Sequence, residues 1–352
     1  MMNLRATVLC SVVLLAAPLF ARDKSDVIVM NNGDRLTCEI SGLDSGVLYV
    51  KLDYILGTSS VQWSKVHHLE SRQLFMVMTE SGLVYTGTLS SSDVPGARPM
   101  KIEVAVDPET KVAIDRTQVV KMEQTSENFL QRLNGDINFG VSYSKGNQAT
   151  QFSLNSDVQY PRERWSAEAS YSSTLADSTG NSAATRNQVT YSGQHLLPWN
   201  NWYYKGLGVF LQSSTQDIDL QTTLGGGIGR YLKNTNNAQI ALLGGLAWQS
   251  TAYHATILPL GTQNIAAAVV AANVRLFHFN KTNLSISAIV LPALSQPGRA
   301  FFDTNASYYM KIFSNLTWNI SFYGNWDTRP PANFSGSDYG TSSGLGWTFG
   351  NK

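Results

Sequence analysis

Histidines are the residues most able to do chemistry in this chain, which has five of them. His67 and His68 are adjacent in a stretch that alternates like a strand, so their side chains point to opposite faces and cannot easily share a metal ion. His195 and His254 have no nucleophile at a recognisable spacing, and neither Gly-x-Ser-x-Gly nor His-Glu-x-x-His occurs. We therefore expect no catalytic residue, no metal site, no cofactor and no enzyme activity.

The segment LGGGIG, residues 224 to 229, is the other candidate for chemistry, because glycine-rich loops can bind phosphate. It lacks the following Lys-Ser/Thr pair and any helix signal. We interpret it as a run of strand glycines.

Composition limits the class of protein. Charged residues make up 14% of the chain, against about 25% in ordinary soluble domains, yet the mean hydropathy is only −0.13. The N-terminal apolar run is short for a membrane-spanning helix, and no longer apolar run follows it. A net charge of +1 gives no reason to expect a nucleic-acid partner. A secreted β-protein or a transmembrane β-barrel fits this combination.

The chain divides into four predicted segments. Residues 1–21 have the basic start, apolar run and small final residue of a secretory signal peptide. Residues 26–123 contain short strands and Gly-containing turns, and NNGDRLTCEI aligns with ESGLVYTGTL about 50 residues later, which predicts a small-β domain of two repeats. Residues 124–132 form a polar linker, and 133–352 form the barrel. Cys38, the one cysteine after the signal peptide, is expected to be buried.

The last segment alternates apolar and polar residues over stretches of about ten residues, as in LNGDINFGVSYS, which is typical of membrane-spanning strands. We predict an all-β fold with a closed, twelve-stranded antiparallel barrel. Its strands are expected near 133–144, 149–160, 164–175, 185–196, 202–213, 219–232, 237–250, 264–277, 282–291, 301–313, 315–326 and 339–349. Aromatic residues gather beside the short turns, as expected for a membrane interface, and include Trp165, Trp199, Trp202 and Trp318.

Charges at inward positions of these strands are the candidate pore lining. By alternation they are Asp136, Asp157, Glu168, Arg186, Asp303 and Lys311. Lys205 shares the parity of Leu207 and Val209, so we interpret it as a lipid-side residue that reaches the headgroups. An open polar channel and a lumen filled by paired side chains both remain compatible with these positions.

The chain ends SSGLGWTFGNK, in which Leu345, Trp347 and Phe349 share one face of a strand. This strand is expected to pair with the first one near Ile137 and so close the barrel. Gly344, Trp347 and Phe349 follow the pattern that outer-membrane proteins present to their insertion machinery, although three residues follow the final Phe.

The stretch GDINFGVSYSKGNQ and this final strand resemble the outer-membrane proteins grouped as domain of unknown function 481, some of which are called salt-induced or YdiY-like. NNGDRLTCEISGL resembles small SH3-like or Sm-like modules. The family resemblance implies a Gram-negative outer membrane and no established activity.

We expect a narrow porin-like channel or a structural envelope protein in the outer membrane, with a periplasmic N-terminal domain; a link to salt or osmotic response rests on family naming alone. A binding or adhesion protein, acting through the outer loops or the periplasmic domain, is the alternative, and an outer-membrane hydrolase the third. Expected partners are outer-membrane lipid and the insertion machinery, with a periplasmic or cell-wall partner as a further candidate.

Overall fold

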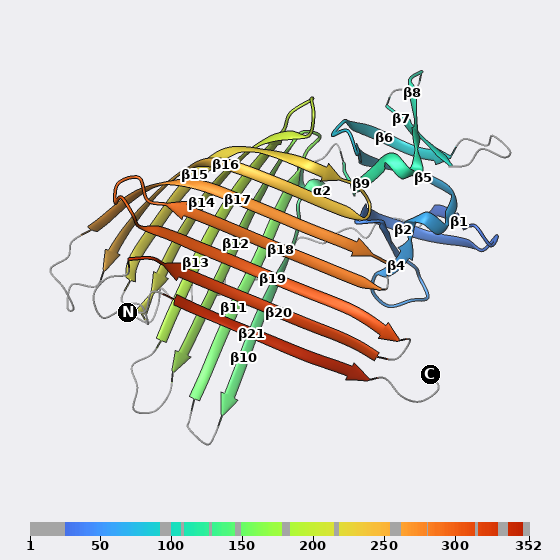
Figure 1. Ribbon diagram of the computed structural model, residues 1–352. Coiled ribbons are helices and arrows are strands. Elements are labelled where there is room, and N and C mark those ends of the chain that lie inside the picture. The colour runs from blue at the N-terminus through green and yellow to red at the C-terminus, as the bar shows by residue number, and fades with distance from the viewer. Residues whose placement is uncertain are drawn as a thin grey trace.

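The structure is a computed structural model that describes residues 25–91, 100–106, 109–126, 129–144, 149–177, 184–214, 218–253, 262–279, 281–313, 316–329 and 337–347. The chain is all-β and has two parts, a small N-terminal domain and a large antiparallel sheet (Figure 1). The predicted signal peptide, His254 and Phe349 lie outside the described residues.

The N-terminal domain repeats one order of elements, in which four strands are followed by a 3-10 turn and a further strand. Its elements are β1 (Asp26–Met30), β2 (Arg35–Asp44), β3 (Val47–Lys51), β4 (Ser59–Gln62), η1 (Trp63–Lys65), β5 (Val66–Thr79), β6 (Val84–Ser91), β7 (Lys101–Ala105), β8 (Lys111–Asp115), η2 (Arg116–Gln118) and β9 (Val119–Gln124). Strand β5 ends the first unit and begins the second. The Trp63 indole Nε1 donates to the carbonyl oxygen of Arg116 at 3.0 Å, which joins the two 3-10 turns.

The strands of this domain pair in the order β4-β3-β2-β1-β5-β6-β7-β8, and β9 pairs with both β2 and β5 to bend the sheet into a small barrel. The alternating apolar residues pack inside it. Fully buried side chains include Ile28, Ile40, Leu69, Phe75 and Val104. Cys38 is buried in the same core, as predicted.

The large sheet contains the twelve predicted strands in chain order, with ends within three residues of those expected. They are β10 (Asn134–Ser144), β11 (Ala149–Pro161), β12 (Trp165–Asp177), β13 (Ala184–Leu196), β14 (Trp202–Ser213), β15 (Ile218–Asn234), β16 (Ala238–Tyr253), β17 (Thr262–His278), β18 (Thr282–Pro292), β19 (Ala300–Phe313), β20 (Leu316–Asp327) and β21 (Ser337–Trp347). A short helix, α2 (Phe129–Arg132), precedes β10.

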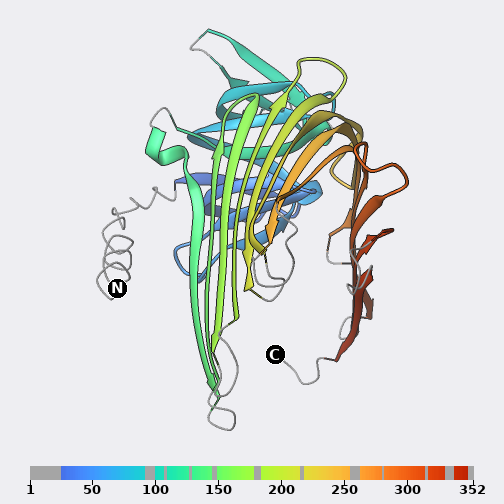
Figure 2. The ribbon, with the colours of Figure 1, turned by 90° about the vertical axis from the view of Figure 1, so that its left-hand side faces the viewer.

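The sheet is open, which differs from the predicted closure. Among the described residues β10 pairs only with β11 and β21 only with β20, so no ladder joins Ile137 to the last strand. Figure 2 shows the strands curving into a trough whose two edges, β10 and β21, stand apart. Alternation along a strand specifies which side chains share a face, but it carries no information on whether two edges meet.

Small residues line the inner face of the trough on β15 and β16. A Cβ atom added to Gly227 would collide with the carbonyl oxygen of Gly244, and one added to Gly245 with that of Gly226. Gly244, on the other face of the same strand as Gly245, has open space at its Cβ position. The LGGGIG segment therefore lies inside β15, as predicted, and its absent side chains allow neighbouring strands to curve inward.

Candidate functional site

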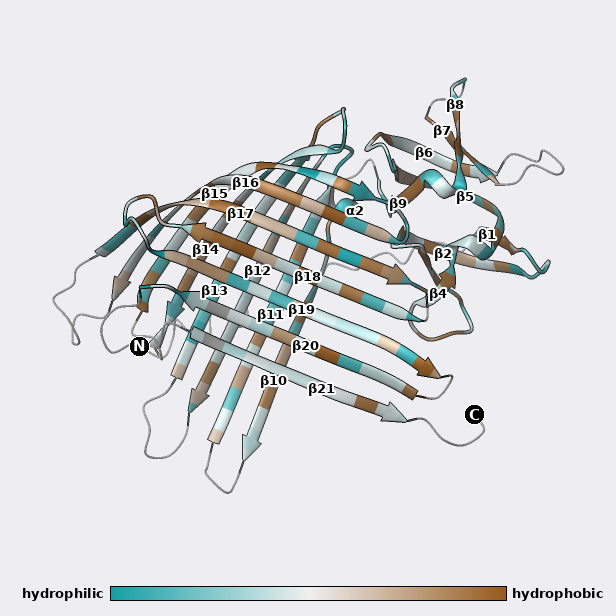
Figure 3. Cartoon of the chain, viewed as in Figure 1, coloured by the Kyte–Doolittle hydropathy of each residue, from teal (hydrophilic) through white to brown (hydrophobic). Residues whose placement is uncertain are grey.

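The two faces of the large sheet differ in chemistry over most of its width. Register pairing places large apolar side chains on the outer face, from Phe139 on β10 through Leu246 on β16 to Leu345 on β21, and these are 65%, 64% and 72% exposed. The alternating brown and teal bands along the strands in Figure 3 show the same pattern. An exposed apolar surface of this extent requires a partner other than water.

All six candidate charges lie on the inner face. The register of each pair of neighbouring strands shows this, because residues directly opposite each other point to the same face. Asp136 lies directly opposite Asp157, Glu168 opposite Gln159, and Arg186 opposite Thr174. On the other side of the trough Asp303 lies opposite Asn325 and Lys311 opposite Thr317. The structure thus brings the first three acids onto neighbouring strands and keeps Asp303 and Lys311 on a separate wall.

The prediction that Lys205 faces lipid was wrong. Lys205 lies opposite Gln194 and Gly227, so it is on the inner face with Leu207 and Val209. Alternation misled here because the inner face is itself apolar around β14 and β17, where Leu211, Ile265 and Ala267 are buried. The same apolar inner patch explains why the alternation of β17 was weak in the sequence.

The N-terminal domain lies across one end of the trough, as Figures 1 and 2 show from two directions. Two short turns of the large sheet bind its backbone through asparagine amides. Asn201, between β13 and β14, donates from Nδ2 to the carbonyl oxygen of Glu80 at 2.8 Å. Asn236, between β15 and β16, donates from Nδ2 to the carbonyl oxygen of Val119 at 2.8 Å. Sequence reasoning missed both, since asparagines in turns are ordinarily explained by turn geometry alone.

Glycines of the N-terminal domain make this close approach possible. Gly46 has φ +70° and its Cβ position lies 3.4 Å from Cβ of Asn236, while Gly82 has φ +83° and its Cβ position lies 3.4 Å from Cα of Asn201. A side chain at either position would meet the turn of the large sheet as well as backbone strain.

Charged residues lie at the same junction, and one pair of them joins the two parts of the chain. Arg275 Nη2 of β17 lies 3.4 Å from Asp44 Oδ2 of β2, and both side chains are more than one third exposed, so the pair contributes at most about 1 kcal/mol. Lys121 Nζ lies 2.6 Å from Glu123 Oε1. Burial lowers the pKa of Lys121, but the negative charges of Glu123 and Asp44 and the hydrogen bond to Glu123 outweigh it and raise that pKa overall. Burial raises the pKa of Glu80, and the positive charge of Lys233 partly opposes this change.

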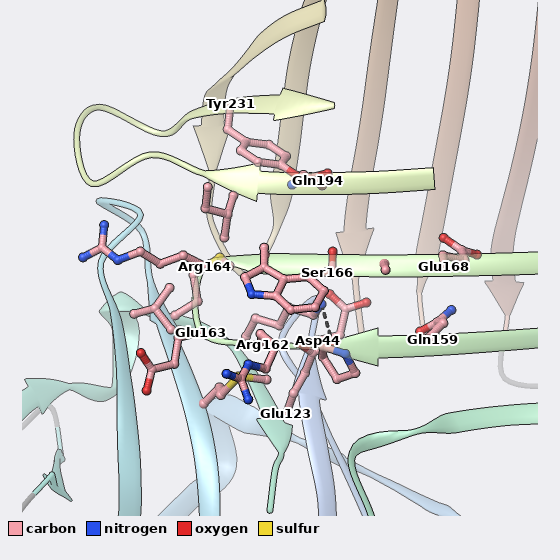
Figure 4. A pocket seen from close by; sticks show the side chains of 18 of the residues that line it. Asp44, Glu123, Gln159, Arg162, Glu163, Arg164, Ser166, Glu168, Gln194 and Tyr231 are labelled. Atoms are coloured by element: carbon pink, nitrogen blue, oxygen red, sulfur yellow. Dashed lines mark hydrogen bonds and ion pairs between the residues drawn. The ribbon is translucent and has the colours of Figure 1, made fainter. Parts of the chain in front are cut away.

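Two cavities lie between the N-terminal domain and the inner face. The first, of about 290 Å³, is lined by charges of both signs from both parts of the chain, and Figure 4 shows its walls. Its charged residues are Asp44, Lys121, Glu123, Arg162, Glu163, Arg164, Glu168 and Arg275. The second, of about 440 Å³, is lined mainly by aromatic and neutral polar residues, including Tyr49, Phe277 and Tyr309. Asp44 and Arg275 line both cavities.

The predicted interface aromatics lie at the end of the trough that carries the N-terminal domain. Trp165 and Trp199 are 43% and 56% exposed. Phe129 of α2 packs on Tyr160 with ring centroids 4.9 Å apart, and Tyr160 packs on Trp165 at 5.4 Å. The Arg230 guanidinium lies 5.6 Å from the ring centre of Trp202. Trp318 Nε1 donates to Ser343 Oγ at 2.9 Å.

The opposite end of the sheet is pinned by a buried ion pair. Arg299, 8% exposed, precedes β19, and its Nη2 lies 2.7 Å from Asp327 Oδ2 at the end of β20. Its Nε donates to Asp327 Oδ1 at 3.1 Å, which completes a bidentate pair. Arg329 Nη1 also donates to the carbonyl oxygen of Pro297 at 2.8 Å.

Two features were sought in the residues that the structure describes, a membrane-spanning helix and a metal-binding cluster. No helix there has the length and apolar character to span a membrane. Likewise, no group of three or more metal-binding side chains occurs among those residues.

The large antiparallel sheet has one apolar exposed face and one concave face that is mostly polar. This all-β fold is compatible with the class of outer-membrane β-barrel proteins. The sequence model of the family described as "Protein of unknown function, DUF481" matches residues 137–349, and the chain belongs to this family. No curated protein matches the chain.

Proposed function

We propose that this protein is a narrow, non-enzymatic channel of the outer membrane, with its N-terminal domain in the periplasm. The single observation that carries the proposal is the division of the large sheet into an exposed apolar face and a polar concave face. The apolar face can contact membrane hydrocarbon, and the polar concave face can contact water and solutes. The six inner charges, Asp136, Asp157, Glu168, Arg186, Asp303 and Lys311, then lie in the lumen.

The proposal includes closure of the sheet in the membrane. Bilayer hydrocarbon offers no hydrogen-bond partner to the free edges of β10 and β21, each of which would leave a row of unpaired backbone groups. Twelve strands form a barrel between the packed eight-stranded type and the open porins. The final strand, with Gly344 and Trp347, is the part we expect the insertion machinery to bind.

Closure is testable by disulfide scanning from Gly140, an inward position at the middle of β10. Cysteine at Gly140 combined with cysteine at Ser342, Gly344 or Gly346 should form an intramolecular disulfide in one register, because these positions also face inward. Cysteine at Leu345, on the outer face, is the matched control and should not cross-link. Cross-linking only between molecules would instead show that the edges join two copies.

Channel activity is testable with the full-length protein in planar bilayers. Discrete conductance steps in KCl, absent from a mock preparation, are expected. The six predicted inner charges comprise four acids and two bases, and Lys205 and Arg275 on the same face bring the bases to four. Only a small reversal potential is therefore expected in a salt gradient. Complete absence of steps would contradict the proposal and favour a structural or binding role.

A further inference from the structure

The junction between the two parts of the chain has one feature that channel activity alone does not explain. The N-terminal domain lies at one end of the trough, which we call the mouth, and the ion pair of Asp44 with Arg275 borders both cavities described above. Asp44 comes from β2, and Arg275 comes from the inner face of β17 opposite Gln239. The ion pair therefore lies where the two cavities adjoin.

The two cavities differ in the charge of their lining residues. The first is lined by four acidic and four basic residues, which gives it no net charge. The second has Asp44 against Arg275 and Lys281, with Tyr49, Phe277 and Tyr309 around them. A charge in a narrow, partly desolvated opening acts on a passing ion far more strongly than the same charge in bulk water.

We propose that the docked N-terminal domain converts the mouth into two portals, and that Asp44 and Arg275 are the residues that set ion selectivity there. This inference rests on the proposed channel function. The solutes that suit such portals are small polar molecules and ions, since cavities of about 290 and 440 Å³ lie at the lower end of the volumes that small-molecule sites have.

Docking itself depends on the asparagine contacts rather than on the ion pair. The Asn201 and Asn236 amides bind backbone carbonyl groups that do not depend on side-chain charge. Asp44 and Arg275 are both partly exposed, so neutralising either one should leave the domain in place. Selectivity and docking can therefore be separated by mutation.

The docking is tested first by a disulfide between Gly46→Cys and Asn236→Cys, since the two Cβ positions are 3.4 Å apart, close to the separation in a disulfide. Gly82→Cys with Asn201→Cys is a second pair at the neighbouring turn, in case strain at Gly46 lowers the yield. At least one pair should cross-link quantitatively on mild oxidation of the folded protein. If neither forms, the domain does not cover the mouth and the inference is wrong.

Selectivity is then measured as the reversal potential of full-length variants in a KCl gradient. Arg275→Gln should shift it toward the cation-selective limit and Asp44→Asn toward the anion-selective limit. Lys111→Gln is the matched control, because Lys111 and Glu103 form a 3.5 Å pair elsewhere in the same domain. The oxidised cross-linked protein should show the same selectivity as the reduced one, since the portals exist in the docked state.

The outcomes separate the two proposals. If the wild-type protein gives no conductance steps, the channel function and this inference both fail. If it conducts but Arg275→Gln and Asp44→Asn leave the reversal potential unchanged, or shift it in the same direction, only the portal assignment is overturned.

Discussion

Asp26 of β1 and Cys38 of β2 lie directly opposite each other, and both side chains are fully buried. The Asp26 carboxylate accepts hydrogen bonds from the Ile40 backbone N–H at 2.8 Å and from Ser71 Oγ at 2.5 Å, so it connects three strands of the N-terminal domain. Burial raises the pKa of the Cys38 thiol to about 12, and the negative charges of Asp26 and Glu39 add to this effect. The thiol is thus held in its protonated, unreactive form.

The first prediction concerns the reactivity of this thiol. In the folded protein with Cys10→Ser, Cys38 should resist alkylation at pH 8 to 9 and should react fully in denaturant, because the reactive species is the thiolate. Thr58→Cys in a Cys38→Ala background is the control, since Thr58 is exposed and should react in the folded state. Rapid alkylation of native Cys38 would contradict the burial.

The same pKa shift predicts how the free energy of unfolding changes as the pH rises. Between pH 9 and pH 12 the unfolded chain loses the thiol proton while the folded chain keeps it, so this contribution is complete below pH 9 and decreases as the pH rises. The decrease should be at most about 1.4 kcal/mol per pH unit. It is measured as the difference in unfolding free energy between wild type and Cys38→Ala at pH 8 and pH 10.

Much of this fold could be predicted from the sequence, because strand alternation reports burial on one face directly. The ends of strands such as β12 and β19 follow from turn residues and period-two patterns. Lys205 was misplaced for a physical reason: Leu207 and Val209 beside it are apolar and yet face inward. Alternation identifies two faces, and only the three-dimensional curvature decides which one is concave.

The covered mouth could not be predicted, since it depends on contacts between residues far apart in the chain. Asp44 and Arg275 are separated by 231 positions, and nothing in either local sequence indicates the other. In the sequence Asn201 and Asn236 look like ordinary turn residues, and only the structure shows that they lie against Gly82 and Gly46. The proposed closure of the sheet in a bilayer is a further case, because it would depend on the surrounding medium and not on a local sequence pattern.

A second prediction tests the curvature of the sheet at Gly245. Gly245→Ala places a methyl group against the carbonyl oxygen of Gly226 and should destabilise the folded sheet by about 1–3 kcal/mol. Gly244→Ala is the adjacent control, because there is open space at its Cβ position. The added methyl group should only lower the conformational entropy of the unfolded chain, which does not destabilise the folded sheet. The midpoint temperature of the gel shift between folded and heated protein in detergent should fall for Gly245→Ala alone. Equal midpoints would show that the strands can separate at no cost.

A third prediction concerns the ion pair at the end distant from the N-terminal domain. Arg299→Ala leaves the Asp327 carboxylate, which is only 17% exposed, without its bidentate partner and should cost about 3–5 kcal/mol. Arg329→Ala removes one exposed hydrogen bond to Pro297 and should cost about 1 kcal/mol. Protease cleavage within residues 293–299 of the intact folded protein is the measurement. It should accelerate strongly for Arg299→Ala and little for Arg329→Ala, whereas equal rates would indicate that the pair does not hold this segment.

The last prediction compares the two faces of β10 at its centre. Phe139 is 65% exposed on the outer face, and Asn138 lies beside it on the inner face. If the outer face contacts hydrocarbon, Phe139→Arg should cost about 2–4 kcal/mol near the bilayer midplane, whereas Asn138→Arg reaches a water-filled lumen and should cost far less. Folding yield into lipid vesicles, followed by urea titration, measures the difference. The two variants have the same new residue at neighbouring positions, so charge and size are matched and only the facing solvent differs. Equal destabilisation would mean that both faces of the sheet contact the same medium, and would exclude a membrane-spanning arrangement for β10.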